Sequence, residues 1–179
     1  MLFSLRHRRE RRETIERLYG AIVAQARLPI FYANLAVPDT IEGRFDLVVL
    51  HVYLLFRRLA GEDKEARAIG QGIFDWFVED MDGSLREMGT GDLSVPKRMQ
   101  AMGEAFYGRA TTYDNALRAT DDTALAAALL RNVYGGGAAA KDAALKLAHY
   151  VRSAVAALAA QETEAILRDA PEWPTAEGE

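Results

Sequence analysis

Histidine is the side chain best suited to bind a metal or move a proton near neutral pH, and this chain has His7, His51 and His149. No two of them share a helix face and no Glu-x-x-His motif occurs, so neither a zinc nor a di-iron site is predicted. The absence of cysteine excludes disulfides and thiolate sites. His51 lies in an apolar stretch, where we favour a histidine at the edge of the core, hydrogen-bonded to the backbone or to an acidic partner. The sequence therefore predicts no metal and no cofactor.

Nucleophiles and phosphate-binding loops are not indicated either. Ser94 and Thr112 have no histidine nearby in the sequence that could act as a general base. The Gly89-Thr90-Gly91 segment lacks the Gly-Lys-Ser/Thr ending of a phosphate loop and follows no predicted strand. We therefore expect that the protein is not an enzyme.

Carboxylates are concentrated in one predicted helix. Asp75, Glu79 and Asp82 follow the i, i+4, i+7 spacing of a single helix face, with Asp80 beside them. Such a stripe is usually a solvated surface, but it could also bind a divalent cation or a basic partner. We predict a docking surface here, together with neighbouring residues. Its predicted residues are Asp75, Trp76, Glu79, Asp82, Lys97 and Arg98.

Residues 1–12, the basic arm, hold five arginines against one acid, which gives +4 from side chains. The other 17 basic and 25 acidic residues give −8, so a basic arm precedes an acidic body with a total of −4. The arm could bind anionic lipid, at about 1 kcal/mol per basic residue near the surface. It could instead bind RNA phosphates, or be a disordered tail that aids solubility. The predicted contact residues are Arg6, Arg8, Arg9, Arg11 and Arg12.

Two apolar sets are candidates for binding a partner. Phe31 and Tyr32 lie in a predicted loop and are assigned to partner binding. Methionines suit adaptable grooves, although a methionine stripe at helical spacing is more often plain core, which we favour here. These methionines are Met81, Met88, Met99 and Met102.

Apolar residues follow helical spacing almost throughout, and no alternating strand pattern occurs. With 179 residues, half of them apolar, the chain is long enough for one domain with a core of its own. The sequence predicts an all-α fold, an irregular bundle of about six to seven helices. Its expected parts are the basic arm 1–12, a single helical domain 13–170 and a disordered tail 171–179.

Several boundaries can be placed from the punctuating residues. The first helix should end at Leu28-Pro29, and residues 30–38 should form an apolar loop. Asp39 should cap a helix with Glu42 in a capping box, and this helix is apolar almost all round, as a buried central helix is. Residues 113–117 should form a short separate helix. The glycines 135–137 should be flexible, and residues 138–168 should form one long helix.

Three segments resemble the ubiquinol–cytochrome c chaperone family, the assembly factors of the cytochrome bc1 complex in mitochondria and alphaproteobacteria. The segment FDWFVEDMDGSLREMGTGDLSVPKRMQAMGEAFYGR is the most similar. The others are LPIFYANLAVPDTIEGRFDLVVLHVYLLFRRL, residues 28–59, and DDTALAAALLRNVYGG, residues 121–136. Together they cover most of residues 10–150, in order, and all are helical in pattern.

The resemblance implies a non-enzymatic chaperone that binds a nascent or newly inserted cytochrome b-type subunit and assists assembly of the bc1 complex. Mitochondrial members act at the ribosomal exit with a small partner subunit, so the ribosome is a further candidate partner. The short N-terminus looks like that of a bacterial member. No apolar run reaches the roughly 20 residues of a membrane span. We therefore expect a cytoplasmic protein, peripheral at the inner face of the inner membrane.

A different class of function competes with this one. The basic arm and Lys97-Arg98 could be the footprint of a ribosome- or RNA-binding module, or of an adaptor on an anionic membrane surface. DNA is not an expected partner.

Overall fold

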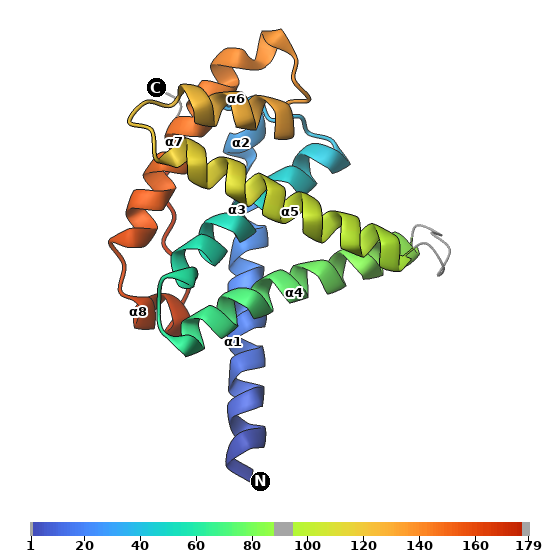
Figure 1. Ribbon diagram of the computed structural model, residues 1–179, viewed down its shortest axis with the longest axis vertical. Coiled ribbons are helices and arrows are strands. Elements are labelled where there is room, and N and C mark those ends of the chain that lie inside the picture. The colour runs from blue at the N-terminus through green and yellow to red at the C-terminus, as the bar shows by residue number, and fades with distance from the viewer. Residues whose placement is uncertain (1, 88–94, 177–179) are drawn as a thin grey trace.

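The computed structural model describes residues 2–87 and 95–176, and of residues 2–5, 84–87, 95, 96 and 98 only the backbone. Every regular element in these ranges is a helix, so the prediction of an all-α fold is confirmed (Figure 1). The sequence-based positions Met88, residues 89–91 and Ser94 lie outside the described residues. The helices are α1 (Leu2–Ala26), α2 (Pro29–Ala33), α3 (Ile41–Ala60), α4 (Lys64–Glu87), α5 (Val95–Leu117), α6 (Thr123–Asn132), α7 (Lys141–Ala159) and α8 (Thr163–Arg168).

Helix α3 is the centre of the bundle, as its all-round apolar character predicts. Every residue from Leu47 to Leu55 is buried, because α1 and α4 pack on one part of its surface and α7 on another. Its cap differs from the prediction. Thr40 is the N-cap, and its hydroxyl oxygen accepts from the Gly43 N–H at 3.1 Å. Asp39 instead forms an ion pair with Arg44 at 2.7 Å.

Helix α1 extends beyond the body of the protein (Figure 1). Its C-terminal half packs against α3 and α4, whereas its N-terminal half, with the basic arm, projects away from the other helices (Figure 1). The arm is therefore helical up to Leu2. Arg6 pairs with Glu10, and Arg9 pairs with Glu13, in the i, i+4 geometry that stabilises an exposed helix.

The apolar segment after α1 is not the predicted loop. Pro29 opens the short helix α2, in the first turn where proline is tolerated because its missing N–H has no helical acceptor. This turn directs Phe31 into the core, where its side chain is fully buried. The expectation that Phe31 contacts a partner is therefore wrong for this structure.

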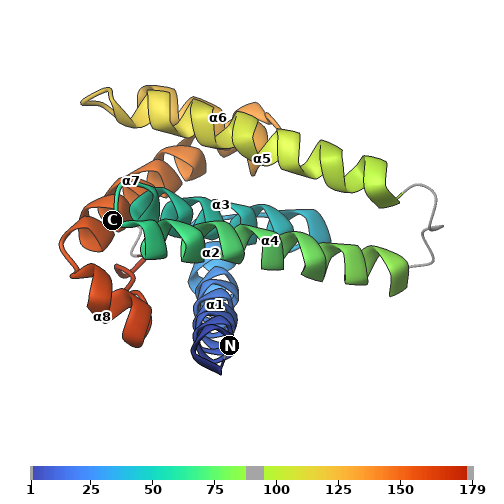
Figure 2. The same cartoon turned by 60° about the horizontal axis from the view of Figure 1, so that its bottom comes forward.

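Helix α5 crosses above the layer formed by α3 and α4 (Figure 2). It is continuous from Val95 to Leu117, so the predicted separate helix over residues 113–117 is its last part. Phe106 attaches it to α4 through Phe74, with ring centroids 4.6 Å apart. This contact between aromatic rings lies near the middle of α5 and holds the helix on the layer of α3 and α4.

The glycines after α6 form a defined turn rather than a flexible link. Gly135 and Gly136 have φ values of 65° and 80°, which side chains with a Cβ rarely adopt. The Gly136 N–H donates to the Leu130 carbonyl at 2.8 Å, which closes the end of α6.

The predicted long C-terminal helix is divided into α7 and α8 around Gln161, and the expected disordered tail is wrong for residues 171–176. The Gln161 side chain donates to the Glu172 carbonyl and accepts from the Glu172 N–H, both at 2.8 Å. Trp173 packs edge-on against His51 with ring centroids 5.1 Å apart, and Ala176 is buried. These contacts together hold a segment whose prolines and acids indicated disorder.

Candidate functional site

An open hollow of about 610 Å³ lies where α1, α3, α4 and α5 meet. Ile41, at the start of α3, is 76% exposed, the largest exposed fraction among the big apolar side chains of the described residues. A second hollow of about 280 Å³ continues under α5 and shares Phe45, Met102 and Arg109 with the first. We call the two hollows together the groove. The first is lined by Tyr19, Val23, Arg27, Ile41, Glu42, Arg44, Phe45, Asp46, Val48, Asp80, Met81, Met102 and Arg109.

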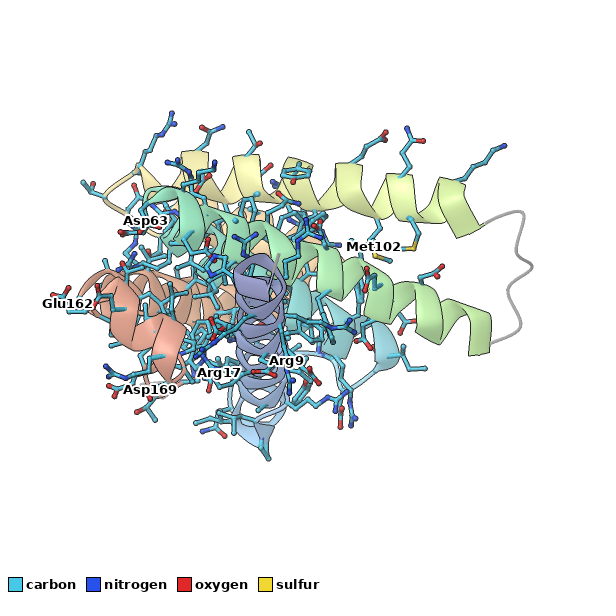
Figure 3. The ribbon with its side chains drawn as sticks, turned by 90° about the horizontal axis from the view of Figure 1, so that it is seen from below. Arg9, Arg17, Asp63, Met102, Glu162 and Asp169 are labelled. Carbon is cyan, nitrogen blue, oxygen red and sulfur yellow. The ribbon has the colours of Figure 1, made fainter. Side chains whose placement is uncertain are left out.

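Flexible apolar side chains form the walls of the groove. Met81 from α4 and Met102 from α5 are both half-buried and line it, and Met102 lies between these two helices (Figure 3). They are therefore not the plain core that the sequence favoured. Met99 is half-buried as well and lines neither hollow. Thioethers on unbranched chains adapt to differently shaped apolar surfaces, which suits a site that binds other proteins.

An ion pair crosses the inner part of the groove. The Arg109 guanidinium donates to Oδ1 of Asp46 at 2.6 Å, and these side chains are 25% and 15% exposed. Burial raises the pKa of Asp46, and the Arg109 guanidinium acts in the opposite direction. The pair joins α3 to α5, and its arginine lines both hollows whereas Asp46 lines the first.

Further polar groups surround the opening. The Tyr19 hydroxyl of α1 donates to Oδ2 of Asp80 on α4 at 2.8 Å, and burial raises the pKa of Tyr19. On the opposite side, the Arg44 guanidinium lies 5.8 Å from the ring centroid of Tyr32. Tyr32 is half-buried and donates to the Ala26 carbonyl at 2.9 Å. Of the predicted Phe31-Tyr32 pair, only Tyr32 lies near the groove opening.

The predicted acidic surface on α4 is divided by the fold. Asp80 lines the groove, whereas Asp75 is exposed and accepts from Gln71 at 2.9 Å. Trp76 is half-buried, with the Arg12 guanidinium 5.4 Å from its ring centroid. Glu79 and Lys97 are exposed, Asp82 is half-buried, and the Arg98 side chain lies outside the described residues. A docking role for this surface stays a prediction.

The basic arm forms a separate site. Arg6, Arg8, Arg9 and Arg12 are exposed, but Arg11 is half-buried and makes two hydrogen bonds to Glu65 of α4, at 2.9 and 2.7 Å. Arg11 therefore anchors the base of the arm to the body. The other four guanidinium groups remain on the surface of the projecting helix.

The sequence favoured a histidine at the edge of the core for His51, and the structure places it inside the core. Its side chain is fully buried, and Nδ1–H donates to the Leu47 carbonyl at 2.7 Å. Nε2 lies 2.9 Å from the Tyr150 hydroxyl. The second hydrogen-bond partner of His51 is therefore a tyrosine and not an acid. Burial lowers the pKa of His51 to about 4, so the ring is neutral at pH 7. Within the part of the chain that the structure describes, no group of three or more potential ligands could hold a metal ion.

Sequence reasoning did not find the α3 wall of the groove. Ile41 and Phe45 are spaced i, i+4, and so are Glu42 and Asp46 beside them. These two pairs, one apolar and one acidic, were the only indication in the sequence that the start of α3 could line a groove. The same pattern occurs in ordinary amphipathic helices, and only the position of Arg109 in the structure distinguishes the two cases.

An all-α body with an open groove whose apolar lining includes isoleucine, phenylalanine and methionine side chains is similar to the grooves in which other proteins bind amphipathic helices. The family model for the ubiquinol-cytochrome C chaperone matches residues 33–173, and the chain belongs to this family. The resemblance seen in the sequence is thereby confirmed. No helix within the described ranges is long and apolar enough to cross a bilayer.

Curated relatives are similar over part of their length. The ubiquinol-cytochrome-c reductase complex assembly factor 1 of Xenopus laevis is 29% identical over 117 residues, which are 65% of this chain and 58% of that protein. The human assembly factor of this name is 29% identical over 118 residues, 66% of this chain and 39% of that protein. This chain thus spans less than two thirds of each relative. Among solved structures, the Cbp3 homolog from Brucella abortus is 38% identical and covers 98% of both chains, with a TM-score of 0.86.

Proposed function

We propose that this protein is a non-enzymatic assembly chaperone of the cytochrome bc1 complex, and that its client is the cytochrome b-type membrane subunit. The observation that carries the proposal is the open groove between α1, α3, α4 and α5. The names of the relatives support the bc1 complex as the target, because they are assembly factors of ubiquinol-cytochrome-c reductase. The choice of cytochrome b as the client rests on the family resemblance.

The groove has the chemistry that such a client needs. Before assembly, a membrane subunit exposes apolar segments that would otherwise aggregate. The exposed Ile41 and the half-buried Met81 and Met102 offer a surface that can cover such a segment without a fixed shape. The α4 acids Asp75 and Glu79 could bind the lysines and arginines that are enriched in cytoplasmic loops of membrane proteins.

The basic arm places the chaperone at the membrane in this proposal. Arg6, Arg8 and Arg9 are exposed on a helix that projects from the body, so they can approach an anionic bilayer without obstruction (Figure 1). The protein would then be peripheral at the inner face of the inner membrane. A second candidate, binding to ribosomal RNA near the site of client synthesis, uses the same exposed guanidinium groups.

Photo-crosslinking tests the client directly. A benzoylphenylalanine residue is placed at Ile41 or Met102 in the groove, and at Leu145 as a control, since Leu145 is 50% exposed on α7 and lines neither hollow. We expect crosslinks to the cytochrome b-type subunit from the groove positions only. Equal crosslinking from Leu145, or none from the groove, would contradict the proposal. Deleting the gene should also lower the level of assembled bc1 complex on native gels.

A further inference from the structure

The walls of the groove restrict the shape of what can bind there. All its lining residues except Arg27, which directly follows α1, belong to helices, and the described residues offer no strand edge that could pair with an extended peptide. Among the recurring modes of peptide recognition, a groove between helices fits an amphipathic helix that lays its apolar side on the walls. Ile41, Phe45 and Met102 are positioned to contact such a side.

The charges in the groove restrict the chemistry of the occupant. Arg44 is paired with Asp39 at 2.7 Å and Arg109 with Asp46 at 2.6 Å. The first hollow is lined by three acids, Glu42, Asp46 and Asp80, and by three arginines, of which Arg44 is neutralised by Asp39 outside the lining. Once the pairs of Arg44 and Arg109 are set aside, the described lining leaves two carboxylates, Glu42 and Asp80, against one guanidinium, that of Arg27.

Glu42 and Asp46 reinforce one another. They lie four residues apart on the same face of α3, and the negative charge of Glu42 adds to the effect of burial in raising the pKa of Asp46. Asp46 already has the Arg109 guanidinium as its cation, so the Glu42 carboxylate beside this pair is the group that favours a further cation.

A wholly apolar occupant would be a poor match for these groups. It would remove water from Glu42, Asp46 and Asp80 and offer no hydrogen bond in return, which is costly for a charged group. A lysine or arginine on the occupant would replace the lost water with a charge-assisted hydrogen bond.

We propose that the groove is selective for an apolar helix that carries a lysine or arginine side chain, with its cation facing the carboxylates of Glu42, Asp46 and Asp80. This inference rests on the proposed function, because it names the feature by which the client segment is recognised. The apolar side of the helix contacts Ile41, Phe45 and the two groove methionines. The basic side chain fixes the register of the helix in the groove.

Three labelled peptides test the selectivity by fluorescence anisotropy with the full-length protein. Each is a helix of about 14 residues, or four turns, made of leucine, alanine and glutamine. The central residue is lysine, norleucine or glutamate. We expect the lysine peptide to bind about tenfold more tightly than the norleucine peptide, since a hydrogen bond between charged groups contributes on this scale. The glutamate peptide should bind most weakly.

The double variant Glu42→Gln and Asp80→Asn should lose the preference for lysine and keep the affinity for norleucine. Both changes are isosteric, and the amide oxygen introduced by Asp80→Asn can still accept from Tyr19, so the fold is maintained, which a melting curve checks. Asp142→Asn, which changes an exposed acid on α7, is the control and should keep the preference.

Equal affinity of the wild-type protein for lysine and norleucine peptides would overturn the inference. So would a preference for glutamate, no binding of any peptide, or an unchanged preference in the double variant. These outcomes leave the proposed function in place if Ile41 and Met102 still crosslink to the cytochrome b-type subunit. Failure of that crosslinking would instead remove the proposed function, whatever the peptides show.

Discussion

The hydroxyl of Tyr150 on α7 lies 2.9 Å from Nε2 of His51, in the middle of α3, and donates a hydrogen bond to it. The other ring nitrogen donates to the Leu47 carbonyl, so a single neutral tautomer satisfies both atoms. Phe31 of α2 and Trp173 of the tail contact the same imidazole ring, with centroids 5.3 and 5.1 Å from it. Three helices and the C-terminal segment therefore meet at one uncharged histidine.

This neutrality makes the stability of the protein depend on pH. Burial lowers the pKa of His51 from its ordinary 6.5 to about 4, so the unfolded chain takes up this proton at a higher pH than the folded chain does. The contribution of the neutral ring is complete above pH 6.5 and is lost as the pH falls toward 4. We expect the free energy of unfolding to fall over this range by about 3 kcal/mol from this residue.

Urea denaturation of the wild-type protein and of His51→Gln, between pH 7.5 and 4.5, measures this effect. His51→Gln should be less stable at pH 7.5, and the gap between the two proteins should close as the pH falls. His149→Gln is the control, because His149 is exposed on α7. If the gap between the wild-type protein and His51→Gln stays constant with pH, the buried ring does not resist protonation.

Trp173 gives a prediction in which two substitutions have opposite signs. Its half-buried ring covers His51, yet its Nε1–H is buried and has no hydrogen-bond partner within the described residues. Trp173→Ala should cost about 2 kcal/mol through lost packing, since the ring is only partly buried. Trp173→Phe keeps an aromatic ring and removes the unsatisfied donor, so it should be neutral or stabilising. Thermal melts that show the phenylalanine variant as unstable as the alanine variant would contradict this account.

The sequence was sufficient to predict the class of fold but not the edges of its elements. The apolar residues 47–55 identify α3 as the central helix, since no exposed helix could carry them all. The tail failed as a prediction because composition averages over residues 171–179 and gives little weight to Trp173. The burial of Phe31 was not predicted either, because Pro29 indicates the end of α1 but does not by itself indicate the start of α2.

The groove was harder to predict from the sequence than the boundaries of the helices were. Its lining comes from four helices, from residues between Tyr19 and Arg109 that are widely spaced in the sequence. They meet because α5 lies above the layer of α3 and α4 (Figure 2). Helical periodicity indicates which face of each helix is apolar, but not where two apolar faces remain uncovered. The spacing of Met81 and Met102 therefore fits a buried core face as well as it fits the wall of a groove.

Two glycines in helices should respond in opposite ways to alanine. A Cβ on Gly43 would lie 2.0 Å from the Pro38 carbonyl oxygen, which the backbone holds in place at the start of α3. Gly43→Ala should destabilise the protein by about 1–3 kcal/mol, as overpacking does. A Cβ on Gly20 of α1 meets nothing within 4 Å, so Gly20→Ala should stabilise by about 0.5–1 kcal/mol. Chemical denaturation of both variants is decisive, and stabilisation by Gly43→Ala would show that the turn before α3 moves freely.

The basic arm can be tested by removing three charges. Replacing Arg6, Arg8 and Arg9 by glutamine should weaken binding to phosphatidylserine-containing liposomes about a hundredfold, at about 1 kcal/mol for each charge. The fold should be unaffected, because all three side chains are exposed and the ion pairs of Arg6 and Arg9 are with neighbouring acids of α1.

The control for the arm has the same net charge. It carries glutamine at Arg118, Arg131 and Arg168, which are exposed elsewhere in the protein, and it should bind liposomes as the wild-type protein does. Equal loss in both variants would show that total charge, not the arm, determines binding. Loss of ribosome cosedimentation in the arm variant, with liposome binding intact, would favour the RNA-binding candidate.

The Arg109–Asp46 pair gives the last prediction, because it links α5 to the buried helix α3 at the groove, whereas the bonds of Tyr53 and Arg57 to Asp114 link the same helices elsewhere. Arg109→Met leaves a largely buried carboxylate without its cation and should cost about 3 kcal/mol at pH 7.5. Adding Asp46→Leu to this variant should restore part of the loss, so that the two changes are not additive. The pKa of Asp46 is already raised by burial, and loss of Arg109 removes the group that opposes this rise. The folded state of Arg109→Met therefore takes up a proton more readily than the unfolded chain, and its deficit should shrink at pH 4.5. Denaturation at the two pH values measures the change, and a deficit independent of pH would mean that the carboxylate is solvated without its partner.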